Sequence, residues 1–195
     1  PYLEAKYFGY QGKASISGVP ISLKELALVK GTKKGEVGLK IGVDMEFGET
    51  ISAGTDCTIF TQVEKNSKGR MTLRYDRFFI NSIDINADFA EVFAIKGHVE
   101  MYENDPIYGD GFGGTLDLKF KKVLDGLGIG VKANFGNCGF DYWEVDASTE
   151  FTPGLQCGPV TLFGFSGGAS MCMKREGSPL DGRAKYKPNK HYGLG

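Results

Sequence analysis

A ten-residue phrase that occurs twice constrains the fold of this chain more than any other feature. Residues 39–48 read LKIGVDMEFG and residues 127–136 read LGIGVKANFG, with Leu, Ile, Gly, Val, Phe and Gly at matching places. Both copies alternate apolar and polar side chains with period two, which is typical of a β-strand with one buried face. A repeated strand followed by further alternating segments predicts a modular, all-β protein.

The same alternation recurs along the chain and sets the predicted fold class. It is found in residues 37–47, 83–89, 93–101 and 116–120. One face of each segment is apolar and the other is polar or charged, as antiparallel sheets with one solvated face require. Residues 21–30 (ISLKELALVK) have an ambiguous period and are expected to form a strand or one short helix. We predict an all-β, mostly antiparallel extended sheet or stacked β-repeat module, with more than about 40% strand and less than about 10% helix.

Three segments are expected along the chain. Residues 1–80 form a first β sub-unit with the phrase at 39–48, and residues 81–173 form a second with the phrase at 127–136. Residues 174–195, rich in Pro, Gly and Lys, are expected to be a polar linker into a further repeat. Because Pro1 is not a natural start, we expect the chain to be an excerpt from a longer, repetitive polypeptide.

Composition excludes several classes of protein. A net charge of −1 with no basic patch argues against a nucleic-acid partner. The 29 glycines have no Gly-X-Y period, so a collagen is excluded. No stretch approaches the length of apolar sequence that a membrane-spanning helix needs, so no membrane span is expected.

The pattern near the C-terminus predicts one hairpin with its register. Residues 140–151 and 159–173 are the strands, folded about Leu155, so that paired residue numbers sum to 310. This register places Val145 beside Phe165, Trp143 beside Gly167 and Tyr142 beside Gly168. Aromatic rings over cross-strand glycines protect the backbone of glycine-rich strands.

The four cysteines are Cys57, Cys138, Cys157 and Cys172, which allow three pairings. None has a CxxC neighbour and the chain has two histidines, which argues against a zinc site. The predicted register places Cys138 opposite Cys172, which favours a disulfide there and an oxidising, extracellular setting. Four free, buried thiols are the alternative. The sequence leaves open whether Cys57 and Cys157 are paired.

One motif suggests a nucleophile. Residues 164–168 read GFSGG, the pattern of a nucleophile elbow with Ser166 at its centre. No alternation of strands and helices precedes it, and only His191 follows as a base, so the serine hydrolase alternative is disfavoured. We predict that Ser166 is an ordinary strand residue, that His98 is an exposed polar residue, and that the chain is not an enzyme.

Two further sets of residues are candidates for ligand binding. Asn104, Asp105 and Asp110 lie near glycines and offer oxygen ligands for calcium, although their spacing also fits a plain polar turn. No other cofactor is expected. The aromatic residues Tyr102, Tyr108 and Phe112 are candidates for stacking on sugar rings, and packing against the sheet is the alternative.

A succession of motifs resembles a known repeat region. It runs from AIKG at 94–97 through NDPIYGDGFGG at 104–114 and FDYWEVDA at 140–147 to GFSGGA at 164–169. This order is similar to that of a β-rich repeat region of very large secreted or cell-surface proteins of Bacteroidetes bacteria, mostly of unassigned function. The likeness covers residues 80–173 and implies export, surface display and a role in adhesion or surface structure. It implies no catalytic residues, and the cysteines are not part of it.

The expected function is therefore that of a structural or adhesive module of a large extracellular surface protein. Such a module builds a fibre, stalk or appendage, or attaches to another surface. The expected partners are neighbouring repeats of the same polypeptide, surface glycans or other copies of the chain. A carbohydrate-binding module is the alternative, and it requires a row of exposed aromatic residues on one face.

Overall fold

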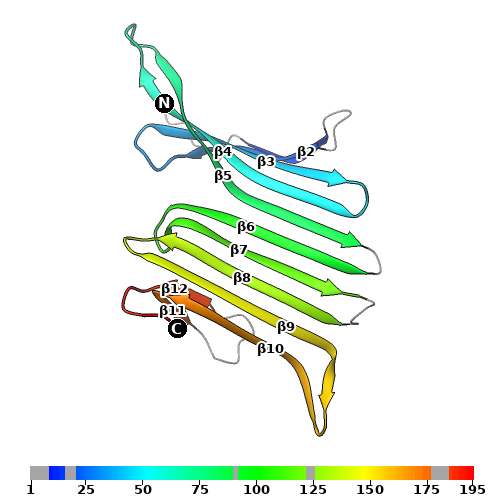
Figure 1. The fold of residues 1–195 in the computed structure, drawn as a ribbon. Helices are drawn as coiled ribbons and strands as arrows, with labels where there is room; N and C mark the ends of the chain where they lie inside the picture. Colours follow the sequence, from blue (N-terminus) through cyan, green and yellow to red (C-terminus); the bar gives the residue numbers. More distant parts are fainter. Residues whose placement is uncertain (1–8, 16–20, 90–91, 122–125, 177–184) are drawn as a thin grey trace. The chain divides into compact units, whose positions relative to one another are not determined.

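The chain is all-β. The computed structural model describes residues 9–15, 21–89, 92–121, 126–176 and 185–195, of which 81% lie in strands and none in a helix (Figure 1). Within these ranges there is accordingly no helix that is long and apolar enough to cross a membrane. The predicted fold class and strand content are confirmed, and residues 21–30 form a strand. The described chain divides into two units, residues 1–83 and 84–195.

The first unit is a meander of antiparallel strands, each paired with the next along the chain. Its strands are β1 (Gly9–Ser15), β2 (Ile21–Lys30), β3 (Glu36–Phe47), β4 (Ile51–Lys65) and the first part of β5 (Met71–Phe89). The phrase at 39–48 lies in β3 and in the turn after it. Gly48 has a φ of 70°, a left-handed conformation that favours glycine, and the chain reverses there into β4.

Charged side chains pair across the strands of the first unit. Lys40 Nζ on β3 lies 2.8 Å from Glu25 Oε2 on β2 and 3.4 Å from Asp56 Oδ2 on β4. Hydrogen bonding to Glu25 is the largest cause that raises the pKa of Lys40, and the charge of Asp56 adds to it. Nearby, the Arg77 guanidinium lies 3.1 Å from the buried Glu36 carboxylate and 3.9 Å from the centre of the Phe60 ring. These charged side chains therefore have their partners within the first unit.

The second unit is also a meander and carries a short additional hairpin. Its strands are the last part of β5, then β6 (Phe93–Asp105), β7 (Gly109–Phe120), β8 (Leu127–Asn137), β9 (Asp141–Cys157), β10 (Val160–Met171), β11 (Met173–Glu176) and β12 (Lys185–Pro188). Strands β6 to β10 pair consecutively, and β11 pairs with β12, always antiparallel. The second copy of the repeated phrase forms β8, so both copies are central strands of a meander.

The β9–β10 hairpin forms, but its predicted register is wrong by four residues. Ala147 pairs with Gly167 and Trp143 with Met171, so paired numbers sum to 314 instead of 310. The reversal occurs at Gly158, whose φ is 64°, three residues beyond Leu155, and the pairing shifts again between Leu162 and Gly164. Because four is even, residues 143–150 and 164–171 keep their predicted faces while their partners change; the pairs next to the turn, such as Leu162 with Leu155, sum to 317 and do not follow this rule.

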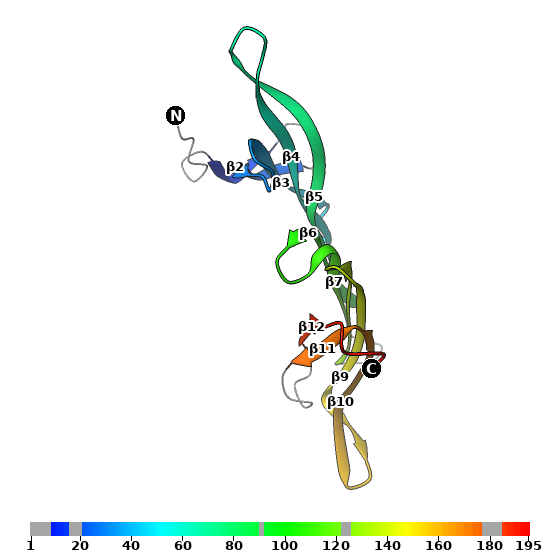
Figure 2. The same ribbon diagram turned by 90° about the vertical axis from the view of Figure 1, so that its left-hand side faces the viewer.

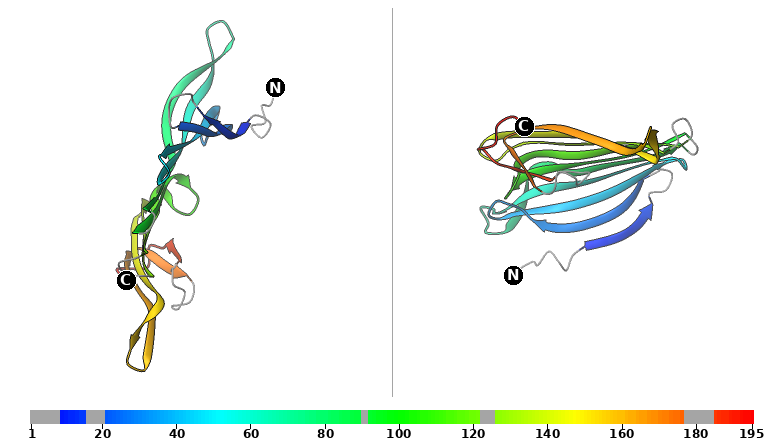
Figure 3. Two further views of the ribbon diagram at one scale, coloured as in Figure 1. Left: turned by 90° about the vertical axis from the view of Figure 1, so that its right-hand side faces the viewer. Right: turned by 90° about the horizontal axis from the view of Figure 1, so that it is seen from below.

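Residues 174–195, predicted to be a polar linker, form strands in part of the range that the structure describes. They contain most of β11 and all of β12, which lie against one side of strands β8 to β10 (Figures 2 and 3). Met173, at the start of β11, is 3% exposed. The backbone carbonyl of Tyr186 on β12 accepts a hydrogen bond from the Tyr108 hydroxyl at 3.4 Å. Buried Met173 and the bond to Tyr108 attach the hairpin to the sheet despite its polar composition.

Candidate functional site

The sheet of the second unit has two chemically distinct faces, and period two assigns each residue to one of them. We call them the polar face and the apolar face. The hairpin β11–β12 lies on the polar face, near Tyr108 and Lys132. On the opposite side of strands β6 to β10, the described part of residues 84–195 places only the C-terminal residues, at the edge of β10, where Leu194 bridges Met171 and Gly195 pairs with Ser170 (Figure 2).

A buried carboxylate is the centre of the polar face. Glu144 on β9 is 0% exposed, and its Oε1 lies 2.8 Å from Lys132 Nζ on β8. Asn134 Nδ2 donates a hydrogen bond to the same oxygen, and Asn134 Oδ1 accepts one from the Tyr102 hydroxyl at 3.1 Å. We call these four residues the Glu144 cluster. A buried charge with a cation and a donor beside it stabilises one arrangement of the strands, because separating the partners leaves the charge without compensation.

Tyrosines cover this cluster. The rings of Tyr102 and Tyr108 stack with centroids 5.1 Å apart, and the Tyr142 hydroxyl donates to the Tyr108 carbonyl at 2.8 Å. Burial is the main cause that raises the pKa of Tyr102 to about 12, with the charge of Glu100 second. Burial also raises the pKa of Tyr142 and, together with the charge of Asp146, that of Tyr186. The tyrosines are thus neutral packing residues.

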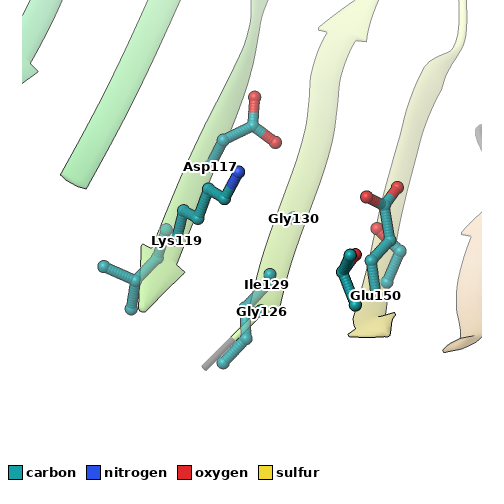
Figure 4. Close-up of a pocket in the computed structure, with 10 residues that line it drawn as sticks. Asp117, Lys119, Gly126, Ile129, Gly130 and Glu150 are labelled. Carbon is teal, nitrogen blue, oxygen red and sulfur yellow. The ribbon is translucent and has the colours of Figure 1, made fainter. Parts of the chain in front are cut away.

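A small pocket of about 210 Å³ opens on the polar face away from the cluster (Figure 4). The floor of the pocket is the glycine backbone of β8, and its polar walls come from β7 and β9. The residues that line it include Asp117, Lys119, Gly128, Gly130, Ser148 and Glu150. The pocket is smaller than the usual size of a small-molecule site. No aromatic ring is among the described residues that line it, so it offers hydrogen bonds to a sugar without a stacking surface.

The apolar face is arranged in rows that cross strands β6 to β10. The pairing registers give four adjacent rows, which are Met101, Phe112, Phe135, Trp143 and Met171; Val99, Gly114, Ala133, Val145 and Ala169; Gly97, Leu116, Val131, Ala147 and Gly167; and Ile95, Leu118, Ile129, Thr149 and Phe165. No charged residue is among them. Phe112 is 45% exposed, Leu116 50% and Phe165 66%. Contiguous exposed apolar surface of this kind marks an interaction site.

The predicted calcium ligands stabilise a turn. Asp105 Oδ1 accepts hydrogen bonds from the backbone N–H groups of Ile107 and Tyr108, both at 2.8 Å. Asp110 Oδ1 accepts one from the N–H of Asn104 at 2.7 Å. Among the residues that the structure describes, no group of three or more His, Cys, Asp or Glu side chains is arranged to hold a metal ion. This geometry supports the polar-turn alternative.

The three aromatic candidates do not form one platform. Tyr102 pairs with Gly111, whereas Phe112 pairs with Met101 and Phe135, so Phe112 lies on the opposite face from Tyr102. Tyr102 and Tyr108 pack over the sheet, and Phe112 stacks on Phe135 with ring centroids 5.3 Å apart. Tyr102, Tyr108 and Phe112 therefore do not together form the row of exposed aromatic residues on one face that a carbohydrate-binding module requires.

The expected disulfide is wrong. All four cysteines lie within the described ranges, all are free, and no two of them are at disulfide distance. The four-residue difference in register separates Cys172 from Cys138, which it was expected to face. Burial raises the pKa of the Cys57 thiol, with the charge of Asp56 adding to the effect, and burial raises that of Cys138.

Ser166 and His98 lie on strands. Ser166 pairs with Ser148 on β9, not with Glu144 as the predicted register gave. His98 Nδ1 lies 2.7 Å from Asp84 Oδ1, an exposed pair that the sequence did not indicate.

The sequence did not reveal the Glu144 cluster, since its members meet only through the registers of β6 to β9. The available signal was an acidic and a basic residue at matching parity, Glu144 and Lys132, in neighbouring alternating segments. In comparisons with known proteins, no family model matches the chain, and neither a curated protein nor a solved structure does.

Proposed function

We propose that this chain is a structural module of an extracellular surface assembly, built by covering the apolar face of its second unit with another β-rich segment. The observation that carries the proposal is that this face is exposed over four rows, while the polar face of the same sheet holds paired, buried charges. An open apolar face of a single sheet is stabilised by packing a second layer on it.

The resemblance of residues 80–173 to repeats of large surface proteins supports the location outside the cell. The free cysteines give that location no additional support, because the expected disulfide is not formed. The proposal includes adhesion to another surface through the apolar face, since building an assembly and adhering to a surface would both need an apolar partner there.

Photo-cross-linking in the parent surface protein tests this function. A benzophenone amino acid replaces Leu116 on the apolar face, and the control replaces His98 on the polar face, also exposed. We expect residue 116 to cross-link to a β-rich segment of the same assembly, identified by mass spectrometry, in clear excess over residue 98. Cross-linking to lipid only, to nothing, or equally at both positions would contradict the proposal.

We also propose that the chain has no hydrolase activity at Ser166. The serine is exposed on β10, and a nucleophile requires a base within hydrogen-bond reach. Its cross-strand partner on β9 is Ser148, which is not a base. A fluorophosphonate probe is expected to leave Ser166 unlabelled, and stoichiometric labelling that disappears on unfolding would establish a hydrolase instead.

A further inference from the structure

The last strand of the second unit's sheet has a free edge without the usual protection. β10 pairs with β9 on one side, and within the described ranges its other edge pairs only with Leu194 and Gly195 (Figure 1). Edge strands are normally protected from further pairing by charged residues or Pro, and the 12 residues of β10 include neither. Every residue from Val160 to Ala169 is exposed. This edge is therefore a template for an additional strand.

The chain itself begins to occupy this edge. Gly195 donates its backbone N–H to the Ser170 carbonyl at 2.9 Å and accepts from the Ser170 N–H at 3.1 Å. Leu194 forms an antiparallel bridge with Met171. Ser170, which has this partner, is 5% exposed, whereas Ala169 beside it is exposed. These contacts define the direction and the register in which a strand pairs with β10.

Backbone geometry identifies the groups that such a strand would bind. Because Ser170 exchanges two hydrogen bonds with Gly195, its N–H and C=O point away from β9, and this direction alternates along a strand. The N–H and C=O groups of Gly168, Ser166 and Gly164 therefore point to the free edge as well. The pairing of β10 with β9 is regular from Gly164 onward. Three bonding positions with small side chains thus continue from the position that Gly195 occupies.

We infer that the free edge of β10 binds the strand with which the parent surface protein continues after Gly195. This strand is antiparallel to β10 and keeps the register that Gly195 and Ser170 begin. The inference rests on the proposed function in one respect, that the chain is a module of a larger surface protein. It concerns the edge of the sheet, whereas the proposed function concerns the apolar face.

The register also defines the side chains that this strand needs. Residues opposite Ala169, Gly167 and Phe165 lie on the apolar face, and the residues between them lie on the polar face. The space above Gly167 is open, since a Cβ there would meet no neighbouring side chain or strand within 4 Å. A large apolar side chain opposite Gly167 covers its backbone, as aromatic residues do for edge glycines. The partner is thus an alternating strand with an apolar residue at that position.

The residues that lead onto this edge match those that lead into β8. Residues 193–195 read GLG, as do residues 126–128, and Leu127 begins the strand that carries the second copy of the repeated phrase. If Gly195 corresponds to Gly128, the residue opposite Gly167 corresponds to Val131, which is apolar and β-branched. A strand of the same type as β8 therefore has the residue that the edge needs.

Hydrogen–deuterium exchange at single-residue resolution tests the inference by comparing the parent surface protein with the 195-residue chain. We expect the amides of Gly164, Ser166 and Gly168 to exchange at least about 100-fold more slowly in the parent protein. The amides of Phe165 and Gly167 point to β9 and are the internal controls, which should be protected in both proteins. Equal exchange of the three outward amides in the two proteins would overturn the inference.

A proline variant tests the pairing directly. Ser166→Pro removes one outward N–H and none of the bonds to β9, and Pro is tolerated in an edge strand when the N–H it replaces faces away from the sheet. In the parent protein it should return the amides of Gly164 and Gly168 to the fast exchange of the 195-residue chain. The matched control Ser166→Ala keeps the N–H and should not.

The Gly167 amide reports whether the β9–β10 ladder is intact in each variant. If Ser166→Pro disrupts the ladder, the comparison of the two unmodified proteins still decides. If the ladder is intact and Gly164 and Gly168 stay protected in Ser166→Pro, the proposed pairing is overturned.

The outcomes also identify the source of the strand and separate this inference from the proposed function. Protection that is lost on dilution from about 100 to about 1 μM would mean that another molecule supplies the strand, which would overturn the continuing strand. If the outward amides exchange fast but residue 116 cross-links to a β-rich segment, the proposed function stands without the edge pairing. If they are protected but residue 116 cross-links to nothing, the covering of the apolar face is overturned and the edge pairing stands.

Discussion

Replacing Lys132 by methionine should destabilise the second unit strongly, because it removes the cation from a carboxylate that has no access to water. Glu144 is 0% exposed, and Lys132 Nζ lies 2.8 Å from its Oε1. Removing one partner of a buried pair costs about 3–5 kcal/mol. Asn134 still donates a hydrogen bond to the carboxylate in the variant, so we expect the lower end, about 3 kcal/mol.

A double-mutant cycle separates the charge from the packing. Glu144→Gln keeps the shape and the oxygen that accepts from Asn134, and it leaves Lys132, whose side chain is 27% exposed, able to reach water. We expect it to cost about 1 kcal/mol. Lys132→Met combined with Glu144→Gln buries no charge, so it should be at least about 2 kcal/mol more stable than Lys132→Met alone.

Urea denaturation followed by tryptophan fluorescence measures these changes. Trp143 is the single tryptophan of the chain and precedes Glu144 on β9, so its emission reports on the unit that contains the pair. The reasoning is refuted if Lys132→Met lowers the free energy of unfolding by less than about 1 kcal/mol, or if the double variant is no more stable than Lys132→Met. Either result would mean that the Glu144 carboxylate is hydrated, or is compensated without the lysine.

Three further predictions concern the faces of the sheet, the tyrosines and the thiols. Gly113→Ala should lower the free energy of unfolding by about 2–3 kcal/mol, because a Cβ there collides with Asn134 and with the Tyr102 hydroxyl. Gly167→Ala, on the open face, should change the free energy of unfolding by less than about 1 kcal/mol. Burial raises the pKa of Tyr102 from about 10 to about 12. The contribution of this neutral phenol to the free energy of unfolding should therefore be complete below pH ~10 and lost as pH rises to ~12. In Tyr102→Phe the free energy of unfolding should decline less steeply over this pH range. Iodoacetamide at pH 8 should label exposed Cys157 well before Cys57, whose pKa is raised by burial, and peptide mapping without reductant should show no disulfide.

Parity could be predicted from the sequence because it is a local property. The alternation in residues 37–47 assigns each side chain to a face without reference to any neighbour, and β3 has that assignment. Register is not local, since it depends on where the chain reverses. Placing the reversal at Leu155 instead of Gly158 kept Trp143 and Val145 on the correct face but gave both the wrong partner.

The error in register explains why the polar site was not predicted. An aromatic ring was expected over a glycine of β10, and Tyr142 instead covers Gly136 of β8, on the other side of its own strand. Glu144 likewise has its partner Asn134 on β8. The chemistry of these residues was readable from the sequence, and the strand that supplies the partner was not. The hairpin β11–β12 was missed because its residues are polar and its single buried side chain, Met173, follows a left-handed residue, Cys172, that interrupts the alternation.

Burial across the two faces is the reverse of the usual expectation for an alternating antiparallel sheet, in which the polar face meets water. Here Glu144, Asn134 and Tyr142 of the polar face are buried, while Phe112 and Phe165 of the apolar face are exposed. The buried polar groups have partners in the same sheet, and the β11–β12 hairpin lies over this face. Exposed phenylalanines have no such compensation inside this unit, and covering them removes apolar surface from water. The sheet is therefore covered on one side and open on the other, and the assembly proposed above would cover the open side.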